Sequence, residues 1–378
     1  MAEKQGMARS FSLYLDLLRL LAALTVMVAH AASSNTLGTP LLPISVGHNA
    51  VVVFFLLSGY VIAFVADGKE ATAREFWISR LARIYSVALP AMLLAPLADQ
   101  IGLALSPQHY AGGLTTHDHP VLRMAASLVF ANELWLVSIM PFSNSAYWSL
   151  CYEMSYYLLF SLWCFGSGRR RWLWLGLAAL VIGPKILLLA PVWALGVLVY
   201  RWQGGYQLPA AMGWACWLAS LAGLVGFQYL DIGEQLSQWT ARLLGAELHR
   251  LLHFSKHFLG DYLLALLIAL NFVGFRCIAG RFDPLFAACG TAIRKAASYT
   301  FSIYLFHLPL VLLFEILLAG MGKGYAYLAA VLAATLVTVL LLGSVTEQQK
   351  DRLRRWLAQL IPAAKPAKFD FPARSSVK

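Results

Sequence analysis

Apolar runs long enough to cross a lipid bilayer constrain the fold of this chain more than any other feature. A transmembrane helix needs about 20 consecutive, predominantly apolar residues. Eight such runs begin near Phe11, Ser45, Ile84, Tyr147, Ala210, Gly260, Ser298 and Tyr325. Two shorter runs lie between Trp172 and Tyr200 and are divided by Lys185, and we interpret them as two short helices rather than one bent helix. The sequence therefore predicts an all-α polytopic membrane protein with about ten transmembrane helices.

The composition supports this class and excludes others. Of the 378 residues, 60% are hydrophobic and 12% are charged, whereas soluble domains carry roughly 25% charged residues. A soluble enzyme of this size needs more polar side chains to cover its surface. The net charge of +11 does not indicate a nucleic-acid partner, because membrane proteins keep Lys and Arg on the cytoplasmic side.

The distribution of basic residues predicts the topology. An N-terminus inside the cell gives ten spans with both termini cytoplasmic, and most of the 29 Lys and Arg residues then fall in cytoplasmic segments. If Val121–Met140 were a full crossing, Arg169–Arg171 would lie outside, so we interpret that segment as re-entrant or surface-bound. The expected organisation is a cytoplasmic N-terminus over 1–10, a transmembrane domain over 11–345 and a basic cytoplasmic tail over 346–378.

Three ionisable residues lie in the first span, where such groups are costly and often functional. Asp16 and Arg19 are three residues apart and can pair on one helix face. Arg19 and His30 are eleven residues apart, which returns them to the same face roughly 16 Å apart along the axis. The stripe can line a polar tunnel; alternatively, Asp16 and Arg19 form a structural ion pair and His30 is a hydrogen-bonded interfacial residue.

Arg80 and Arg83 lie three residues apart at the cytoplasmic mouth of the third span. Two guanidinium groups on one face suit a phosphate-bearing ligand. The alternative is that they only obey the positive-inside rule.

Two later spans carry further polar groups. Glu153 lies in an aromatic, apolar span, with Trp148 and Ser149 within reach of it or of a ligand. His307 precedes Pro309, which weakens the helix locally. Each also has a structural interpretation: Glu153 as a buried acid that holds a helix contact, and His307 as a hydrogen-bonded core residue.

In this order, these motifs resemble the membrane-bound acyltransferase family 3. The resemblance extends from residue 12 to about 345 and rests on the combination, since no single motif is specific. The matching positions are Asp16, Arg19, His30, Arg80, Arg83, Trp148, Ser149, Glu153 and His307. The sequence departs from the family at His48–Ala50, where many relatives have Gly-Val-Asp, and at Ser86–Val87, which replaces a Pro. Neither departure removes a motif residue.

The resemblance implies an O-acyltransferase of a bacterial inner membrane. It would move an acyl group, commonly acetyl, from cytoplasmic acyl-CoA to a hydroxyl of an extracytoplasmic or lipid-linked carbohydrate, without a metal. Acyl transfer needs a base, and a histidine titrates near neutral pH. His30 would be that base or a transient acyl carrier, and Glu153 a secondary acid or orienting group beside Arg19 and Asp16. The residues expected to bind acetyl-CoA are Arg80, Arg83, Arg19, Trp148, Ser149 and His307.

The main alternative is a transporter or flippase that uses the same intramembrane charges as a substrate or proton path.

Other candidate motifs are weaker. His249, His253 and His257 are spaced to line one helix face and could hold zinc, but a solvated amphipathic helix is favoured. The His117–His119 segment similarly suggests a metal but is favoured as an exposed or acceptor-facing loop. The five cysteines form no C-x-x-C and are expected to be small core residues.

Overall fold

The computed structural model describes residues 7–32, 34–39, 41–43, 45–68, 70, 72–110, 116–202 and 208–362. Within these ranges the chain is helical and contains no strand. The longer helices are α1 (Arg9–Ala31), α3 (Ser45–Gly68), α4 (Ala73–Leu105), α6 (Trp148–Phe165), α7 (Gly168–Ile182), α8 (Pro184–Trp202), α9 (Ala210–Tyr229), α12 (Phe258–Ile278), α13 (Asp283–Ala297), α14 (Thr300–Leu317) and α15 (Tyr325–Val345). The shorter helices are α2 (Ser34–Leu37), α5 (Pro120–Leu128), α10 (Ile232–Leu244), α11 (Ala246–Leu251) and α16 (Lys350–Leu360). Single 3₁₀ turns join them at η1 (Pro107–Tyr110), η2 (Ser145–Tyr147), η3 (His253–Ser255), η4 (Ala279–Phe282), η5 (Ala319–Met321) and η6 (Glu347–Gln349).

The predicted class, an all-α polytopic membrane protein, is confirmed. In the described part of the chain, eight segments are long and apolar enough to cross a membrane: α1, α3, α4, α8, α9, the segment from α12 through α13, α14, and the segment from α15 through α16. The other two expected spans are also helices. They are α6, which carries Glu153 among aromatic residues, and α7, which has 15 residues.

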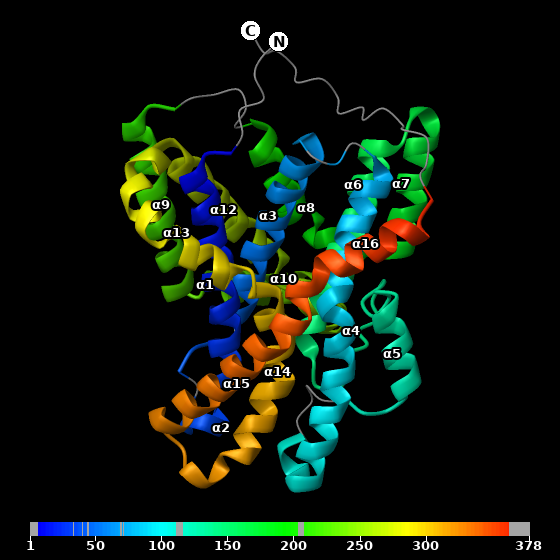
Figure 1. The fold of residues 1–378 in the computed structure, drawn as a ribbon, viewed down its shortest axis with the longest axis vertical. Coiled ribbons are helices and arrows are strands. Elements are labelled where there is room, and N and C mark those ends of the chain that lie inside the picture. The colour runs from blue at the N-terminus through cyan, green and yellow to red at the C-terminus, as the bar shows by residue number, and fades with distance from the viewer. Residues whose placement is uncertain are drawn as a thin grey trace.

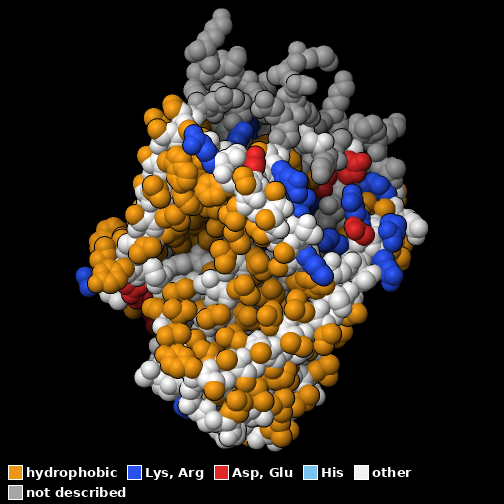
Figure 2. All heavy atoms as spheres, turned by 60° about the vertical axis from the view of Figure 1, so that its left-hand side comes forward, with side chains coloured by type: hydrophobic (Ala, Val, Ile, Leu, Met, Phe, Trp, Pro, Cys, Tyr) orange, Lys and Arg blue, Asp and Glu red, His pale blue; other side chains and the backbone are white. Residues whose placement is uncertain are grey.

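The two ends of the molecule differ in charge. Figure 1 shows that α1 begins at the upper end, where α3 also ends and α4 begins. On the face drawn in Figure 2, Lys and Arg side chains gather in the upper half, and the lower half is mainly hydrophobic. Because basic residues mark the cytoplasmic side, this distribution agrees with the predicted orientation, in which the upper end is cytoplasmic.

Helices α3 and α8 pack unusually closely because each offers a glycine to the other. A Cβ atom added to Gly59 would lie 2.0 Å from the carbonyl oxygen of Trp193, and one added to Gly196 would lie 2.0 Å from that of Leu56. Such small-residue contacts allow helix backbones to approach in membranes. This packing fixes α3, which lines the site described below, against α8.

The two short runs around Lys185 form two helices, as predicted. The chain breaks between α7 and α8 at Gly183, whose φ of 84° is unfavourable for other residues. The ten-span topology places Lys185 in an outer segment, but its side chain is fully buried. Its ammonium group bonds to the buried carboxylate of Glu133 and to the carbonyl of Val137 at 2.5 Å. The segment after α5 is thereby tied to the α7–α8 turn.

The only helix in the segment 121–140 is α5, which begins at Pro120 and has nine residues, and the rest of the segment is irregular chain. Nine helical residues rise about 14 Å, which is too short to cross a bilayer. The interpretation of this segment as surface-bound or re-entrant therefore agrees with the structure. Burial raises the pKa of Glu133 within it, although Lys185 opposes the shift.

Helix α4 begins earlier than the apolar run predicted. Thr72 caps it by accepting a hydrogen bond from the Glu75 amide at 3.2 Å. The helix therefore starts eleven residues before Ile84 and already contains Arg80 and Arg83. The described part of the C-terminal tail packs on it, because Arg74 donates to the carbonyl of Ile361 at 2.8 Å and to that of Ala358 at the end of α16. Residues 363–378 of the expected tail and 1–6 of the expected N-terminus lie outside the described residues.

Candidate active site

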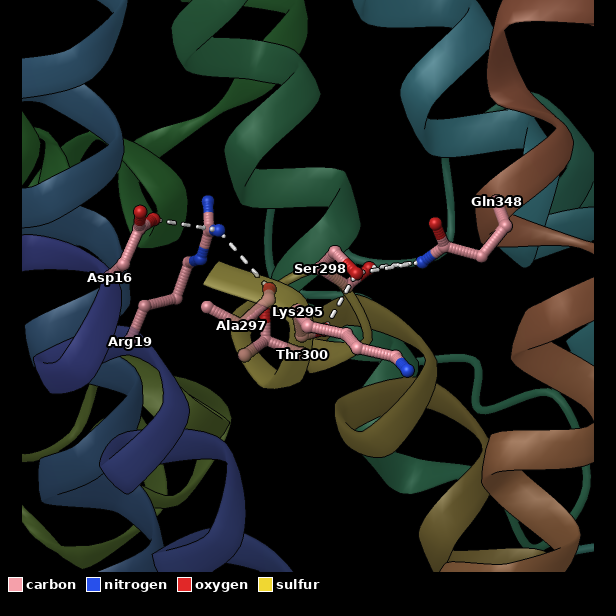
Figure 3. Close-up of polar contacts among 7 residues, drawn as sticks. All are labelled: Asp16, Arg19, Lys295, Ala297, Ser298, Thr300 and Gln348. Carbon is pink, nitrogen blue, oxygen red and sulfur yellow. Dashed lines mark hydrogen bonds and ion pairs between the residues drawn. The ribbon is translucent and has the colours of Figure 1, made fainter. Parts of the chain in front are cut away.

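Arg19 lies midway along α1 and holds the predicted ion pair. One terminal nitrogen of its guanidinium donates to Asp16 at 3.1 Å and to the carbonyl of Ala297 at 3.1 Å. Figure 3 shows the side chain reaching from α1 toward the end of α13. The Nε–H of Arg19 is buried and has no hydrogen-bond partner among the described residues. This N–H group can therefore donate a hydrogen bond to a ligand.

The carbonyl that Arg19 uses lies at the break between α13 and α14. Thr300 donates to Ala297 at 2.9 Å, and Gln348 donates to the carbonyl and the hydroxyl of Ser298 at 3.0 and 2.9 Å (Figure 3). Glu347 accepts from the backbone amide and the hydroxyl of Ser302 at 2.9 and 2.8 Å. Turn η6 thus holds the first turn of α14 in place, a role that the sequence did not suggest.

A narrow cavity of about 60 Å³ brings four of the predicted site residues together. Its lining comes from α1, α3, α4, α6 and α14 and includes the predicted residues Arg19, Arg83, Ser149 and Glu153. Phe54, Phe55 and Tyr304 supply apolar and aromatic walls. A cavity lined by both charged and aromatic residues suits a ligand with an anionic part and a less polar arm.

Glu153 is the acidic group of this cavity. Its carboxylate accepts hydrogen bonds from Ser58 on α3 at 3.0 Å and from Tyr157 one turn along α6. Trp193 on α8 donates to Ser58 at 3.3 Å. Ser58 therefore links α8 to the Glu153 carboxylate, and the close packing of α3 on α8 fixes the orientation of that carboxylate.

The two arginines of α4 have different surroundings. Arg80 is 5% exposed and makes a bidentate pair with Glu70, with both hydrogen bonds at 2.8 Å. Its guanidinium also lies 4.7 Å from the ring centroid of Phe76. Arg83 instead lines the cavity, and no described residue accepts a hydrogen bond from its side chain. The pair expected to act together is therefore divided: Arg80 is held by Glu70 through both terminal nitrogens, although its buried Nε–H has no partner among the described residues, whereas Arg83 lines the cavity.

His30 and His307 lie together, although the sequence placed them in different roles. Nδ1 of His30 is 3.1 Å from Nε2 of His307, and the ring centroids are 5.0 Å apart. Nδ1 of His30 is also 2.9 Å from the carbonyl oxygen of Val26. On the other ring, Nδ1 of His307 faces the carbonyl oxygens of Tyr304 at 2.7 Å and Ile303 at 3.1 Å.

These contacts assign the tautomers of the neutral rings. Two carbonyl oxygens face Nδ1 of His307, so that nitrogen carries the proton and Nε2 is an acceptor. Nδ1 of His30 therefore carries a proton and donates to Nε2 of His307 or to Val26. Nε2 of His30 is left with its lone pair, and no described residue bonds to it. His30 is thus arranged as a base with one free nitrogen.

The His30–His307 pair adjoins the cavity through Tyr304. Tyr304 lines the cavity and lies one helical turn before His307 on α14. Its hydroxyl bonds with Ser149 at 2.8 Å and donates to the carbonyl of Ala146 at 2.9 Å. The predicted residues Arg19, Arg83, Ser149, Glu153, His30 and His307 therefore form one continuous region across the protein interior.

Trp148 does not line the cavity in the described structure. It is buried, stacks on Phe254 at 4.4 Å between centroids and lies parallel to the His48 ring at 6.2 Å. His48 bonds to Asp261 at 2.9 Å. His48, one of the departures from the family pattern, thus has a local partner on α12.

The other histidine motifs do not form clusters. His249, His253 and His257 were expected on one helix face, but this is wrong, because α11 ends at Leu251 and η3 intervenes before α12. His249 bonds to Ser237 at 3.1 Å. His117 bonds to Asp99 at 3.1 Å, while Arg123 bonds to the exposed Asp118 and holds the pKa of that carboxyl below its ordinary value.

The cysteines occupy separate positions in the helices. All five are free, and Cys151 and Cys164 are buried in α6, as expected of small core residues, whereas Cys216, Cys277 and Cys289 are half-buried.

Comparisons with known proteins agree with the resemblance seen in the motifs. A family model described as "Acyltransferase domain" matches residues 12–345. The acyltransferase MdmB of Streptomyces mycarofaciens is 35% identical over 178 residues, which are 44% of this chain and 43% of that relative. The match thus spans less than half the length of the relative. No solved structure matches the chain. Because the family model extends from the first span to the last, the chain belongs to this family of membrane acyltransferases.

Proposed function

We propose that the protein is a multi-pass O-acyltransferase of a bacterial inner membrane. It moves an acyl group, acetyl in the simplest case, from cytoplasmic acyl-CoA to a hydroxyl of an extracytoplasmic or lipid-linked carbohydrate. The observation that carries this proposal is the His30–His307 pair, which leaves Nε2 of His30 free and lies one helical turn along α14 from Tyr304, a wall residue of the cavity that contains two guanidinium groups.

The donor enters from the cytoplasmic end. Arg83 and Arg19 line the cavity there and can bond to phosphate oxygens or to the carbonyls of the pantetheine arm. Arg19 and His30 lie roughly 16 Å apart along α1. A thioester on a long, thin arm can therefore approach His30 while the nucleotide stays at the cytoplasmic mouth. The present cavity of about 60 Å³ has room for only a few water molecules, so donor binding must widen it.

The chemistry at His30 is base-assisted acyl transfer. The acceptor hydroxyl gives its proton to Nε2 of His30 while its oxygen attacks the thioester carbonyl carbon. A carbon–oxygen bond forms, the carbon–sulfur bond breaks, and the proton passes from His30 to the departing sulfur. His307 accepts the hydrogen bond from Nδ1 of the protonated His30 and so stabilises its positive charge. Glu153 balances the charge of Arg83 on the donor side.

The test is acetyl-CoA turnover by the purified protein in lipid nanodiscs. We expect wild type to release CoA thiol, and His30→Ala to reduce the rate by about 100-fold or more, the usual contribution of a general base. His119→Ala, a histidine substitution in the exposed outer loop, is the matched control and should retain the wild-type rate. Full turnover by folded His30→Ala would refute the role of His30. Counterflow of an unmodified solute without acetyl-CoA consumption would instead identify a transporter or flippase.

A further inference from the structure

A second, larger cavity lies at the outer end of the protein. It has a volume of about 430 Å³, within the range of small-molecule binding sites, and is several times larger than the inner cavity. The polar residues that line it are Asn35, Ser106, His109, Glu315 and Lys323. They come from α2, the end of α4, η1, α14 and the chain before α15. Three parts of the chain that are distant in sequence, at residues 35, 105–109 and 315–327, therefore converge on one hollow.

Glu315 is the central polar group of this cavity. It is 2% exposed, and its carboxylate accepts from His109 at 2.7 Å and from Asn35 at 3.2 Å. Tyr327 donates to the backbone carbonyl of Glu315 and places its ring in the same wall. A buried carboxylate that has partners from two other segments is a built arrangement, because each partner lowers the cost of burying the charge.

The lining selects a class of ligand. Carboxylate, imidazole, carboxamide, ammonium and hydroxyl groups offer both donors and acceptors. Glu315 disfavours an anion, Lys323 disfavours a cation, and five polar side chains disfavour a lipid chain. A neutral molecule with many hydroxyl groups, each able to donate and accept, fits this set best. Carbohydrates have this chemistry, and the ring of Tyr327 adds an apolar surface for a sugar face.

Helix α14 contributes residues to both the outer cavity and the proposed reaction centre, and α1 ends between these two levels. Glu315 follows His307 by eight residues on α14, which is about 12 Å along the axis. Asn35 follows His30 by five residues, just beyond the end of α1. Between the two levels lies a thin apolar layer in which Ala31 and Val311 are fully buried and Tyr327 is 4% exposed. Tyr327 belongs both to this layer and to the cavity wall.

We propose that the outer cavity, lined by Asn35, His109, Glu315 and Tyr327, binds one sugar unit of the carbohydrate acceptor. This inference rests on the proposed function and identifies where the acceptor is held. The separation of about 12 Å exceeds the reach of a single sugar ring. The bound unit is therefore a neighbour of the one that is acylated, and the reacting hydroxyl passes Ala31 and Val311 to reach His30.

The experiment measures sugar binding directly, without acetyl-CoA. Saturation-transfer NMR is recorded on the protein in lipid nanodiscs, which avoids sugar-based detergents, with a panel of methyl glycosides and disaccharides as probes. We expect at least one panel member to bind wild type. Glu315→Gln and His109→Ala should weaken that binding at least tenfold, because each removes a charge-assisted hydrogen bond in the pocket. Asn35→Ala changes a more exposed residue, and it replaces Glu315→Gln in the binding measurement if the Glu315 variant does not fold.

The matched control is Glu247→Gln, the same change at an exposed outer carboxylate whose partner is Arg250. It should bind sugars within twofold of wild type. The assignment is overturned if no panel sugar binds wild type, or if folded pocket variants bind within twofold of it.

Acetyl-CoA hydrolysis without acceptor, measured on the same samples, separates this inference from the proposed function. Pocket variants should hydrolyse acetyl-CoA within twofold of wild type, and a loss of hydrolysis with unchanged sugar binding would overturn the pocket assignment. If wild type binds sugar at the pocket but never consumes acetyl-CoA, the proposed acyltransferase function is refuted, whereas the assignment of the pocket as a sugar site stands.

Discussion

Nε2 of His307 lies 3.1 Å from Nδ1 of His30, so that two histidines separated by 277 residues form a hydrogen-bonded pair. His307 is fully buried, and two backbone carbonyls fix its proton on Nδ1. The arrangement resembles the pairing of a catalytic base with an orienting acceptor, with a neutral imidazole in the acceptor's place. His307 acts through His30 and is therefore a positioning residue.

Substitution of His307 should lower kcat and leave the KM for acetyl-CoA unchanged. His307→Ala removes the acceptor that stabilises protonated His30, and we expect a loss of about 10- to 100-fold in kcat, part of the usual contribution of a general base. His307→Gln should recover part of this rate, because its side-chain oxygen can accept the same hydrogen bond. Steady-state kinetics on both variants checks the prediction. Equal rates for Ala and Gln, or a change confined to KM, would contradict the positioning role.

Arg80 and Arg83 should fail in different ways when they are replaced. Arg83→Ala should raise the KM for acetyl-CoA about 10- to 100-fold, because a hydrogen bond to a charged group contributes about 1.5–3 kcal/mol. Arg80→Ala leaves Glu70 buried and unpaired, which costs about 3–5 kcal/mol of stability. Thermal unfolding and donor kinetics on each variant distinguish the two roles.

The matched control is the double change Glu70→Gln with Arg80→Met. It removes both charges of the buried pair, so it should restore folding and retain the wild-type KM. A raised KM in this stable double variant would place Arg80 in the donor site.

The sequence predicted local features well and distant pairings poorly. The ten expected spans are all helices, although α4 begins eleven residues before its apolar run, and the Asp16–Arg19 pair followed from helix spacing, because both features depend on neighbouring residues. Spacing also placed Arg80 and Arg83 on one face. It could not show that Arg80 pairs with Glu70 whereas Arg83 lines the cavity, because Glu70 lies outside the helix, between α3 and α4. The His30–His307 contact depends on how α1 docks against α14, and no periodicity within either helix encodes that.

The buried pair of Glu133 and Lys185 was missed for the same reason. A lysine between two apolar runs usually marks a loop, and its partner lies 52 residues earlier in irregular chain. Lys185→Met should destabilise the protein by about 3–5 kcal/mol, because Glu133 then remains buried without a counter-charge. Unfolding measured by denaturant checks this. Adding Glu133→Gln should recover most of the loss, and a single variant as stable as wild type would show that the carboxyl is neutral without the lysine.

The group around His257 should make stability depend on pH. His257 precedes α12 at the outer end, with its ring centroid 5.2 Å from that of His48 and its Nδ1 atom 4.0 Å from the Glu234 carboxylate. Burial, together with His48 and Lys256, lowers the pKa of His257 to about 4, although Asp261 and Glu234 oppose the shift. The native state therefore keeps this ring neutral at a pH where the unfolded chain, with a histidine pKa of about 6.5, takes up a proton.

Stability from His257 is consequently present above about pH 6.5 and is lost as the pH falls toward 4, because the unfolded state binds more protons in that window. Between pH 7 and 5 the loss should be about 2 kcal/mol. His257→Gln removes the titrating group, so its free energy of unfolding should fall less steeply over the same interval, whatever its stability at pH 7. The comparison is made by denaturant unfolding of both proteins at pH 7, 6 and 5. Parallel curves for wild type and His257→Gln would show that the ring titrates equally in the folded and unfolded states.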